Sequence, residues 1–210
     1  MSTGSPAPQP SQSPSPQLPS ARLAELGLTL PPVAAPVAAY VPAVRVGDLV
    51  HTSGQLPFVD GALPAVGHVG DTAGDGAGSA GDGAAAGAAD VTARTATVSP
   101  EQARDLARTA TVSPEQARDL ARTAALNALA AVDALVGLDA VVQVVKIVGF
   151  VASAPGFGGQ PGVVDGASTL IGEVFGDAGR HARSAVGVAE LPLNSPVEIE
   201  ITVRVADALA

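Results

Sequence analysis

The sequence predicts an α+β fold whose elements follow one another in the order β-β-α-β-α-β-β. Three patterns support this prediction. A helix with clear start and end signals covers about 114–136, and a valine-rich strand follows at 140–152. Near the end, residues 197–205 alternate between apolar and polar side chains, which is the period of a strand. We expect two helices on one face of a single mixed sheet.

The N-terminal part predicts a tail, a short helix and a hairpin. Residues 1–20 are mostly Ser, Pro and Gln, and such a segment buries too little apolar surface to offset its ordering entropy. We therefore expect a disordered tail over 1–20 and a short helix over 21–28. The segments 40–46 and 49–53 then form a strand pattern interrupted by Gly47-Asp48, which indicates a hairpin.

An insertion and an internal repeat follow the hairpin. Residues 70–92 contain almost only Gly, Ala, Asp, Ser and Thr, and we expect a flexible loop there. Residues 95–108 are repeated letter for letter at 109–122, and each copy contains the helix start Ser-Pro-Glu-Gln. Only the second copy runs into the long helix. We therefore expect one domain over 21–210 with an insertion at about 70–108.

The remaining elements predict an oligomer. Gly137 suits the end of the first long helix, because the position after a helix favours glycine. The strand at 140–152 is apolar on both faces, so both faces need a cover. A second helix at 163–175 and strands at 184–189 and 197–205 complete the domain. Since the helices cover only one face, we expect the sheets of several copies to pack together.

Charge and composition exclude several classes of function. The net charge is −9 and the 210 residues include only 11 Lys and Arg, so nucleic-acid binding is not expected. Without cysteine, disulfides, thiolate metal sites and cysteine nucleophiles are excluded. The three histidines are far apart, and we expect no metal and no cofactor. No targeting segment or membrane span is evident, so we expect a cytoplasmic protein without membrane contact.

The strongest functional signal lies in residues 180–203. Arg183 opens an otherwise apolar strand and must find an anion, while Glu198 and Glu200 alternate with apolar residues in the last strand. An arginine and a carboxylate in one cleft can hold a substrate carboxylate and handle a water or proton beside it. Alternatively, Arg183 forms a structural ion pair and Glu198 is a solvated strand residue.

These residues belong to a set of motifs whose order and spacing resemble the RidA/YjgF family, in a divergent branch often described as endoribonuclease L-PSP-like. The resemblance covers about 25–70 and 109–206. The matching pieces are Tyr40 and Gly47, Thr52-Ser53-Gly54-Gln55, Ala125-Leu126-Asn127, Lys146, Ala182-Arg183-Ser184, Leu191-Pro192 and Val197-Glu198-Ile199-Glu200.

The resemblance implies a chorismate-mutase-like fold and a homotrimer with three clefts between subunits. It also implies hydrolytic deamination of 2-imino or enamine acids to 2-oxo acids and ammonia, without a cofactor. Arg183 matches the arginine that binds the substrate carboxylate, and Glu198 matches the glutamate that places or activates water. Tyr40, Ser53 and Gly54 match further substrate-binding positions.

Three departures from the family pattern leave alternatives open. His181 stands where deaminating members usually have proline and is a further candidate for substrate binding. Ser168 takes a position that is often asparagine, and Gly187 replaces a larger residue. A trimer that only binds small carboxylates is therefore the alternative function. An endoribonuclease or translation inhibitor fits the acidic charge least well.

Overall fold

The computed structural model describes residues 17–33, 39–70 and 110–206 of the chain. The expected flexible loop after Gly70 and the first copy of the repeat lie outside these residues. The helices are α1 (Pro19–Glu25), α3 (Pro114–Val136) and α4 (Gln160–Phe175), with short 3-10 turns at Leu138–Ala140, Gly176–Gly179 and Pro192–Asn194. The strands are β1 (Ala43–Val46), β2 (Leu49–Thr52), β3 (His68–Val69), β4 (Ala110–Val112), β5 (Val141–Ala152), β6 (Ala182–Val188) and β7 (Val197–Val205).

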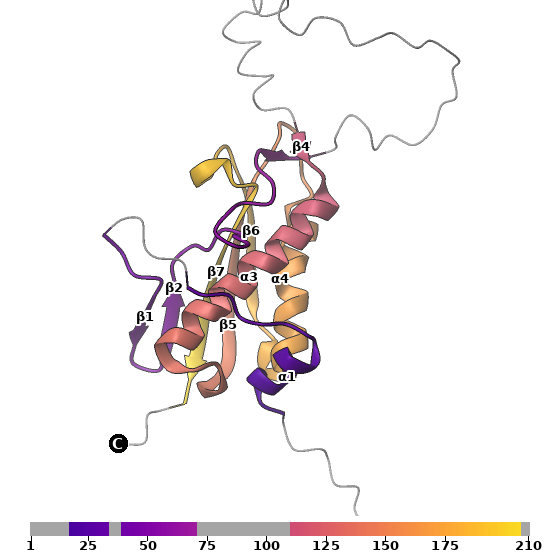
Figure 1. The fold of residues 1–210 in the computed structure, drawn as a ribbon. Helices are drawn as coiled ribbons and strands as arrows, with labels where there is room; N and C mark the ends of the chain where they lie inside the picture. Colours follow the sequence, from indigo (N-terminus) through magenta and orange to yellow (C-terminus); the bar gives the residue numbers. More distant parts are fainter. Residues whose placement is uncertain (1–16, 34–38, 71–109, 207–210) are drawn as a thin grey trace, which may run out of the picture.

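Five strands form one mixed sheet in the order β1-β2-β7-β5-β6. Strands β5 and β6 are parallel and are joined through α4, whereas the other neighbours are antiparallel. Helices α3 and α4 lie side by side over the same face of the sheet (Figure 1). The predicted α+β class and the predicted order of strands and helices in this sheet are therefore confirmed.

Local sequence signals account for the ends of α3. Ser113 is the N-cap, and its side chain accepts a hydrogen bond from the Gln116 backbone N at 3.2 Å, while Pro114 takes the first helical position. Gly137 ends the helix with a φ of 79°, a left-handed value that glycine adopts without steric cost. The second copy of the repeat therefore supplies the start of the core helix, as predicted, and it also contains β4.

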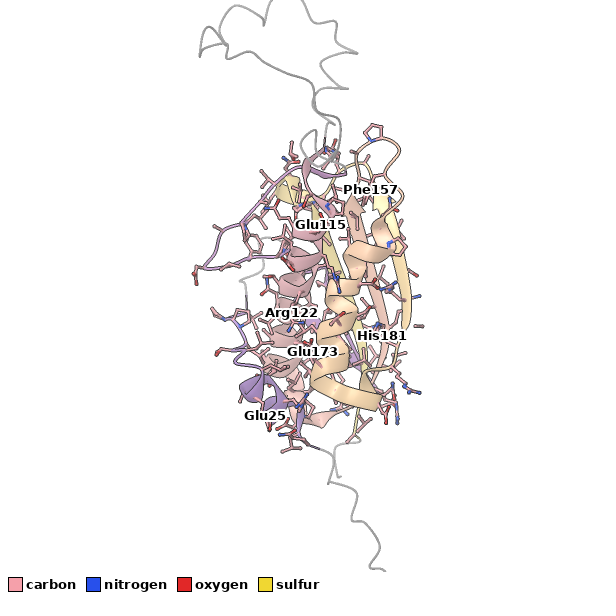
Figure 2. The ribbon with its side chains drawn as sticks, turned by 90° about the vertical axis from the view of Figure 1, so that its right-hand side faces the viewer. Glu25, Glu115, Arg122, Phe157, Glu173 and His181 are labelled. Atoms are coloured by element: carbon pink, nitrogen blue, oxygen red, sulfur yellow. The ribbon has the colours of Figure 1, made fainter. Side chains whose placement is uncertain are left out.

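Glycines allow the helices to approach the sheet and each other closely. A Cβ on Gly149 of β5 would overlap the side chain of Val164 on α4. One on Gly166 of α4 would overlap the backbone carbonyl of Arg118 on α3. Between the helices, Arg122 of α3 and Glu173 of α4 form an ion pair at 2.7 Å (Figure 2). The two helices thus pack against each other and against the sheet at distances that leave no room for a side chain at these glycines.

Several boundaries differ from the sequence prediction. Helix α1 begins at Pro19, inside the segment expected to be disordered, because the backbone N and hydroxyl of Ser20 both donate to Asp139. Helix α4 begins at Gln160, where Pro161 suits the first turn. Strands β3 and β4 form a small parallel pair that was not predicted.

The face of the sheet that the helices do not cover carries apolar side chains. Phe150 of β5 lies in register with Val186 of β6 and with Glu198 of β7. Phe150 and Glu198 each lie between two buried residues of their strands. Large apolar residues exposed along the same sheet include Val44, Val46, Val142, Val145 and Val186. Within the described residues, no helix combines the length and the apolar character needed to cross a membrane.

Candidate functional site

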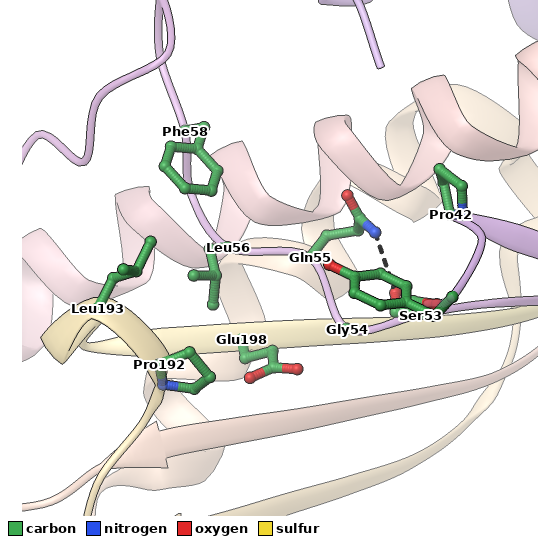
Figure 3. Close-up of a pocket in the computed structure, with 10 residues that line it drawn as sticks. Pro42, Ser53, Gly54, Gln55, Leu56, Phe58, Pro192, Leu193 and Glu198 are labelled. Carbon is green, nitrogen blue, oxygen red and sulfur yellow. Dashed lines mark hydrogen bonds between the residues drawn. The ribbon is translucent and has the colours of Figure 1, made fainter. Parts of the chain in front are cut away.

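A pocket of about 570 Å³ lies where the segment before β1, the loop after β2 and the 3-10 turn Pro192–Asn194 approach β7 (Figure 3). It is lined by Tyr40, Pro42, Ser53, Gly54, Gln55, Leu56, Phe58, Pro192, Leu193 and Glu198. Four of the six residues predicted for the site therefore meet in one pocket: Tyr40, Ser53, Gly54 and Glu198.

A local break in strand pairing builds one wall of this pocket. The hydroxyl of Thr52 accepts a hydrogen bond from the Ile201 backbone N at 3.0 Å. Pairing resumes at Gln55, which exchanges two backbone hydrogen bonds with Ile199. Ser53 and Gly54 lie between these two attachment points without a backbone bond to β7. The Ser-Gly step is thus a bulge held at both ends.

Ser53 is tied to the segment that leads into β1. Its backbone N donates to the carbonyl of Pro42 at 2.8 Å, and its hydroxyl donates to the carbonyl of Val41 at 2.6 Å. The hydroxyl proton of Ser53 is therefore engaged in holding the backbone beside Tyr40. Tyr40 is about half exposed, with 47% of its surface accessible, and it borders the mouth of the pocket.

Gly54 lies directly against the carboxyl group of Glu198. A Cβ at residue 54 would overlap the Oε1 atom and the neighbouring carbons of that side chain. The glutamate carboxylate therefore lies against the backbone of the bulge, and Figure 3 shows it pointing toward Gly54. This close approach explains why a glycine is needed there.

The environment of Glu198 favours its protonated form. Burial raises the pKa of the Glu198 carboxyl, and the nearby charge of Glu200 raises it further. Both carboxylates lie on the sheet face that the helices leave open, two residues apart on β7. Among the described residues, none donates a hydrogen bond to the Glu198 side chain. A carboxyl group with a raised pKa in a pocket is a candidate for accepting and returning a proton.

Asn127 of α3 fixes the loop that follows the bulge. Its Nδ2 atom donates to the carbonyls of Leu56 at 2.8 Å and of Phe58 at 3.1 Å. The carbonyl of Leu56 also accepts from the backbone N of Phe58 at 2.8 Å, whereas that of Phe58 has no other donor among the described residues. The sequence motif containing Asn127 thus has a structural role, which motif matching alone did not predict.

Arg183 lies on the other face of the sheet. It is in register with Ile147 of β5, which is buried under the helices and in register with Ile201 of β7. Its Nη1 atom donates to Asp165 Oδ1 at 2.5 Å and to Ser168 Oγ at 3.2 Å, both on α4. The Nε and Nη2 atoms form no hydrogen bond with any residue in the described ranges. Asp165 was not singled out from the sequence.

His181 completes a chain of hydrogen bonds with Arg183. The His181 Nδ1 atom lies 2.6 Å from the carbonyl of Gly179, an acceptor, so Nδ1 carries the proton. In neutral His181, Nε2 then accepts from the hydroxyl of Ser168 at 3.0 Å, and that hydroxyl oxygen accepts from Arg183. Asp165 and Ser168 therefore hold one edge of the Arg183 guanidinium in place, and His181 positions the Ser168 hydroxyl.

The predicted site residues thus form two groups within one chain. The glutamate group consists of Tyr40, Ser53, Gly54 and Glu198 in the pocket. The arginine group consists of Asp165, Ser168, His181 and Arg183 at the junction of α4 and β6, which is an edge strand. The sequence analysis expected Arg183 and Glu198 in one cleft, and a single chain does not bring them together. Throughout the described ranges, no three His, Asp or Glu side chains gather as metal ligands would.

Comparison with known proteins identifies the family. The sequence profile of the endoribonuclease L-PSP family matches residues 89–205, more than half of the 210 residues. The chain belongs to this family, which is also called RidA/YjgF. The resemblance drawn from the motifs is thereby confirmed. The matched region contains Arg183 and Glu198.

Individual members of the RidA/YjgF family match the chain over most of its length. Protein TCP17 of Trypanosoma cruzi is 35% identical over 187 residues, which is 88% of this chain and 92% of that protein. The crystal structure of Atu1372 from Agrobacterium tumefaciens, a protein of unknown function, is 35% identical with a TM-score of 0.65, covering 90% of this chain and 92% of that one. A candidate endoribonuclease from Shewanella oneidensis MR-1 is 27% identical with a TM-score of 0.69, covering 90% and 100%.

Proposed function

We propose that this protein hydrolyses reactive 2-imino acids, or the enamines in equilibrium with them, to 2-oxo acids and ammonia. The observation that carries the proposal is the Glu198 carboxyl, whose pKa is raised in a pocket that also contains the backbone of Gly54. A site that only binds the carboxylate of a ligand does not need a carboxyl group of the protein, such as that of Glu198, beside it.

The reaction needs one carboxylate anchor and one proton-transfer group. Arg183 would bind the substrate carboxylate through Nε and Nη2, since its Nη1 is already held by Asp165 and Ser168. The Glu198 carboxylate would take a proton from water as the water oxygen bonds to the imine carbon. Glu198 would then return this proton to the nitrogen, which gives a carbinolamine. Transfer of the carbinolamine hydroxyl proton through Glu198 to the same nitrogen would break the carbon–nitrogen bond, form the 2-oxo group and release ammonia.

This mechanism requires two copies of the chain, because Arg183 and Glu198 face away from each other within one copy. We propose that the arginine group of one subunit meets the glutamate pocket of the next in a homotrimer. The uncovered apolar side chains of the sheet support this, since exposed apolar surface of this kind marks an interface. The cytoplasm remains the proposed compartment, supported by the lack of cysteine.

A carboxylate-binding trimer without catalysis is the second candidate. The observation that favours it is that the arginine group is complete without Glu198, with one guanidinium edge held and the other open. Such a group could bind a small carboxylate by itself. The net charge of −9 gives neither candidate a basic surface for RNA, despite the ribonuclease name of the family.

The two candidates are separated by an activity assay with matched variants. An amino-acid oxidase would generate imines in situ, and the release of ammonia and 2-oxo acid would be followed. Acceleration by the native protein that disappears in both Arg183→Ala and Glu198→Gln supports the proposed reaction. If the native protein does not accelerate imine hydrolysis, and if it binds carboxylates in a way that depends on Arg183 but not on Glu198, the result supports the non-catalytic binding function.

A further inference from the structure

The pocket that contains Glu198 has two chemically different ends. Ser53, Gly54 and the Glu198 carboxylate form a polar end, while Leu56, Phe58, Pro192 and Leu193 gather on the other side of the glutamate (Figure 3). Among the described residues that line the pocket, Glu198 is the only charged one. A ligand whose reacting carbon lies beside Glu198 would therefore extend any longer side chain into apolar surroundings.

Leu193 is held in a strained backbone conformation at the apolar end. Its φ is 57° and its ψ is 22°, values of the left-handed region that a branched apolar residue rarely adopts. Hydrogen bonds fix this turn, from Asn194 N to Leu191 O at 3.2 Å and from Ser195 N to Pro192 O at 3.0 Å. Backbone strain of this kind persists only where the surrounding structure imposes it, and it is concentrated at ligand sites.

The strained turn leaves Leu193 largely exposed. In the single chain, 67% of its surface is accessible. The residue thus combines an unfavourable backbone with an exposed apolar side chain, two costs that core packing does not offset. A ligand that contacts Leu193 would cover apolar surface that is otherwise in water.

The opposite wall of the apolar end is fixed before any ligand binds. The carbonyls of Leu56 and Phe58 both accept hydrogen bonds from Asn127, which anchors this loop to α3. Since both walls are held by hydrogen bonds, the apolar end loses little freedom when it is occupied. The whole pocket, at about 570 Å³, has more room than a three-carbon acid fills.

We propose that the site selects acids with a large apolar side chain, of the leucine or phenylalanine type, over small ones such as those derived from alanine. The apolar end formed by Leu56, Phe58, Pro192 and Leu193 would bind this side chain. The inference rests on the proposed function for the position of the reacting carbon, and it adds the class of substrate. Acidic and basic side chains would be disfavoured, because this end offers them no partner.

The test compares kcat/KM for imines generated from alanine, leucine and phenylalanine. An extra methylene in an apolar pocket contributes about 10-fold or more, so we expect the leucine-derived imine to exceed the alanine-derived one by at least about 10-fold. In Leu193→Ala this ratio should fall several-fold. The control is Leu135→Ala, which truncates an exposed leucine of α3 and should leave the ratio as it is. A ratio near one in the native protein overturns the inference.

A binding measurement keeps this inference distinct from the proposed reaction. Titration calorimetry would compare pyruvate with 4-methyl-2-oxopentanoate, which carry the same 2-oxo acid group. Tighter binding of the larger acid, weakened in Leu193→Ala, supports the inference even if no imine is hydrolysed. Equal binding of the two acids, or no binding of either, overturns it. Imine hydrolysis without a preference for size would leave the proposed reaction intact and remove only the inference.

Discussion

The carboxyl group of Glu198 occupies the space that a side chain on Gly54 would fill. The two residues come from strands that are distant in sequence, and the break in pairing between Thr52 and Gln55 brings them together. The position of the Glu198 carboxyl, the proposed proton-transfer group, therefore depends on having a glycine at residue 54 of the bulge.

Gly54→Ala should displace Glu198 and nearly abolish imine hydrolysis. Because a shift of about 1 Å in a catalytic group can cost about 100-fold, we expect kcat/KM to fall by at least that factor. Overlap in a packed site should also lower the free energy of unfolding by about 1–3 kcal/mol. Gly172→Ala is the matched control, because a Cβ there meets open space on the surface of α4. Native activity in Gly54→Ala would contradict this role of the glycine.

The rate should depend on Glu200 through the acidic limb of the pH profile. In the proposed reaction Glu198 acts first as a base, so the rate should fall as the pH decreases through its raised pKa. Glu200→Gln removes the neighbouring charge that contributes to that raised pKa, so the acidic limb should move to lower pH. The measurement is kcat/KM against pH for both proteins. An unchanged limb would exclude Glu200 as an influence on the catalytic carboxyl.

Stability should respond to Glu198→Gln with a definite sign. A carboxyl whose pKa is raised by folding binds more protons in the folded state, so its contribution to stability decreases as the pH rises above the unfolded value. Above the folded pKa the loss is complete. The neutral glutamine side chain avoids this loss. The melting temperature of the Glu198→Gln variant should therefore exceed that of the native protein by about 1–2 °C at pH 8 but not at pH 4. A native protein that is more stable than the variant at pH 8 would show that another contact stabilises the carboxylate.

Asn127→Ala should loosen the loop beside the pocket. It removes one of the two donors to the Leu56 carbonyl and leaves the Phe58 carbonyl without its donor, which should reduce the free energy of unfolding by about 1–3 kcal/mol and raise KM. Thr123→Ala is the control on the same helix, since its hydroxyl bonds only within α3, to Asp119. Thermal melts and steady-state kinetics give both values. An effect on stability equal in the two variants, without a change in KM, would remove the link between Asn127 and the site.

Much of the fold could be predicted because its elements carry local signals. The Ser113 cap, the proline after it and Gly137 define α3 from the sequence alone. Strands β3 and β4 were missed because they have only two and three residues, and their pairing joins segments on either side of a long insertion. Such short strands show no periodic pattern from which they could be predicted.

The composition of the site was easier to predict than its geometry. Alternation in β6 places Arg183 and Ser184 on opposite faces, but only the register with β5 decides which face the helices cover. That register depends on contacts between strands, which the sequence does not display. The ion pair with Asp165 was missed for the same reason, since it links α4 to β6 across a long separation.

The proposed active site combines Arg183 of one copy of the chain with Glu198 of another. Its most direct test is to mix Arg183→Ala and Glu198→Gln, each inactive alone, and to refold them together. In a cyclic trimer of random composition, about three quarters of the assemblies are mixed, and each mixed assembly holds one intact cleft of three. We therefore predict recovery of about a quarter of the native imine hydrolysis. No recovery in mixed trimers, whose composition is verified by native mass spectrometry, would contradict the claim.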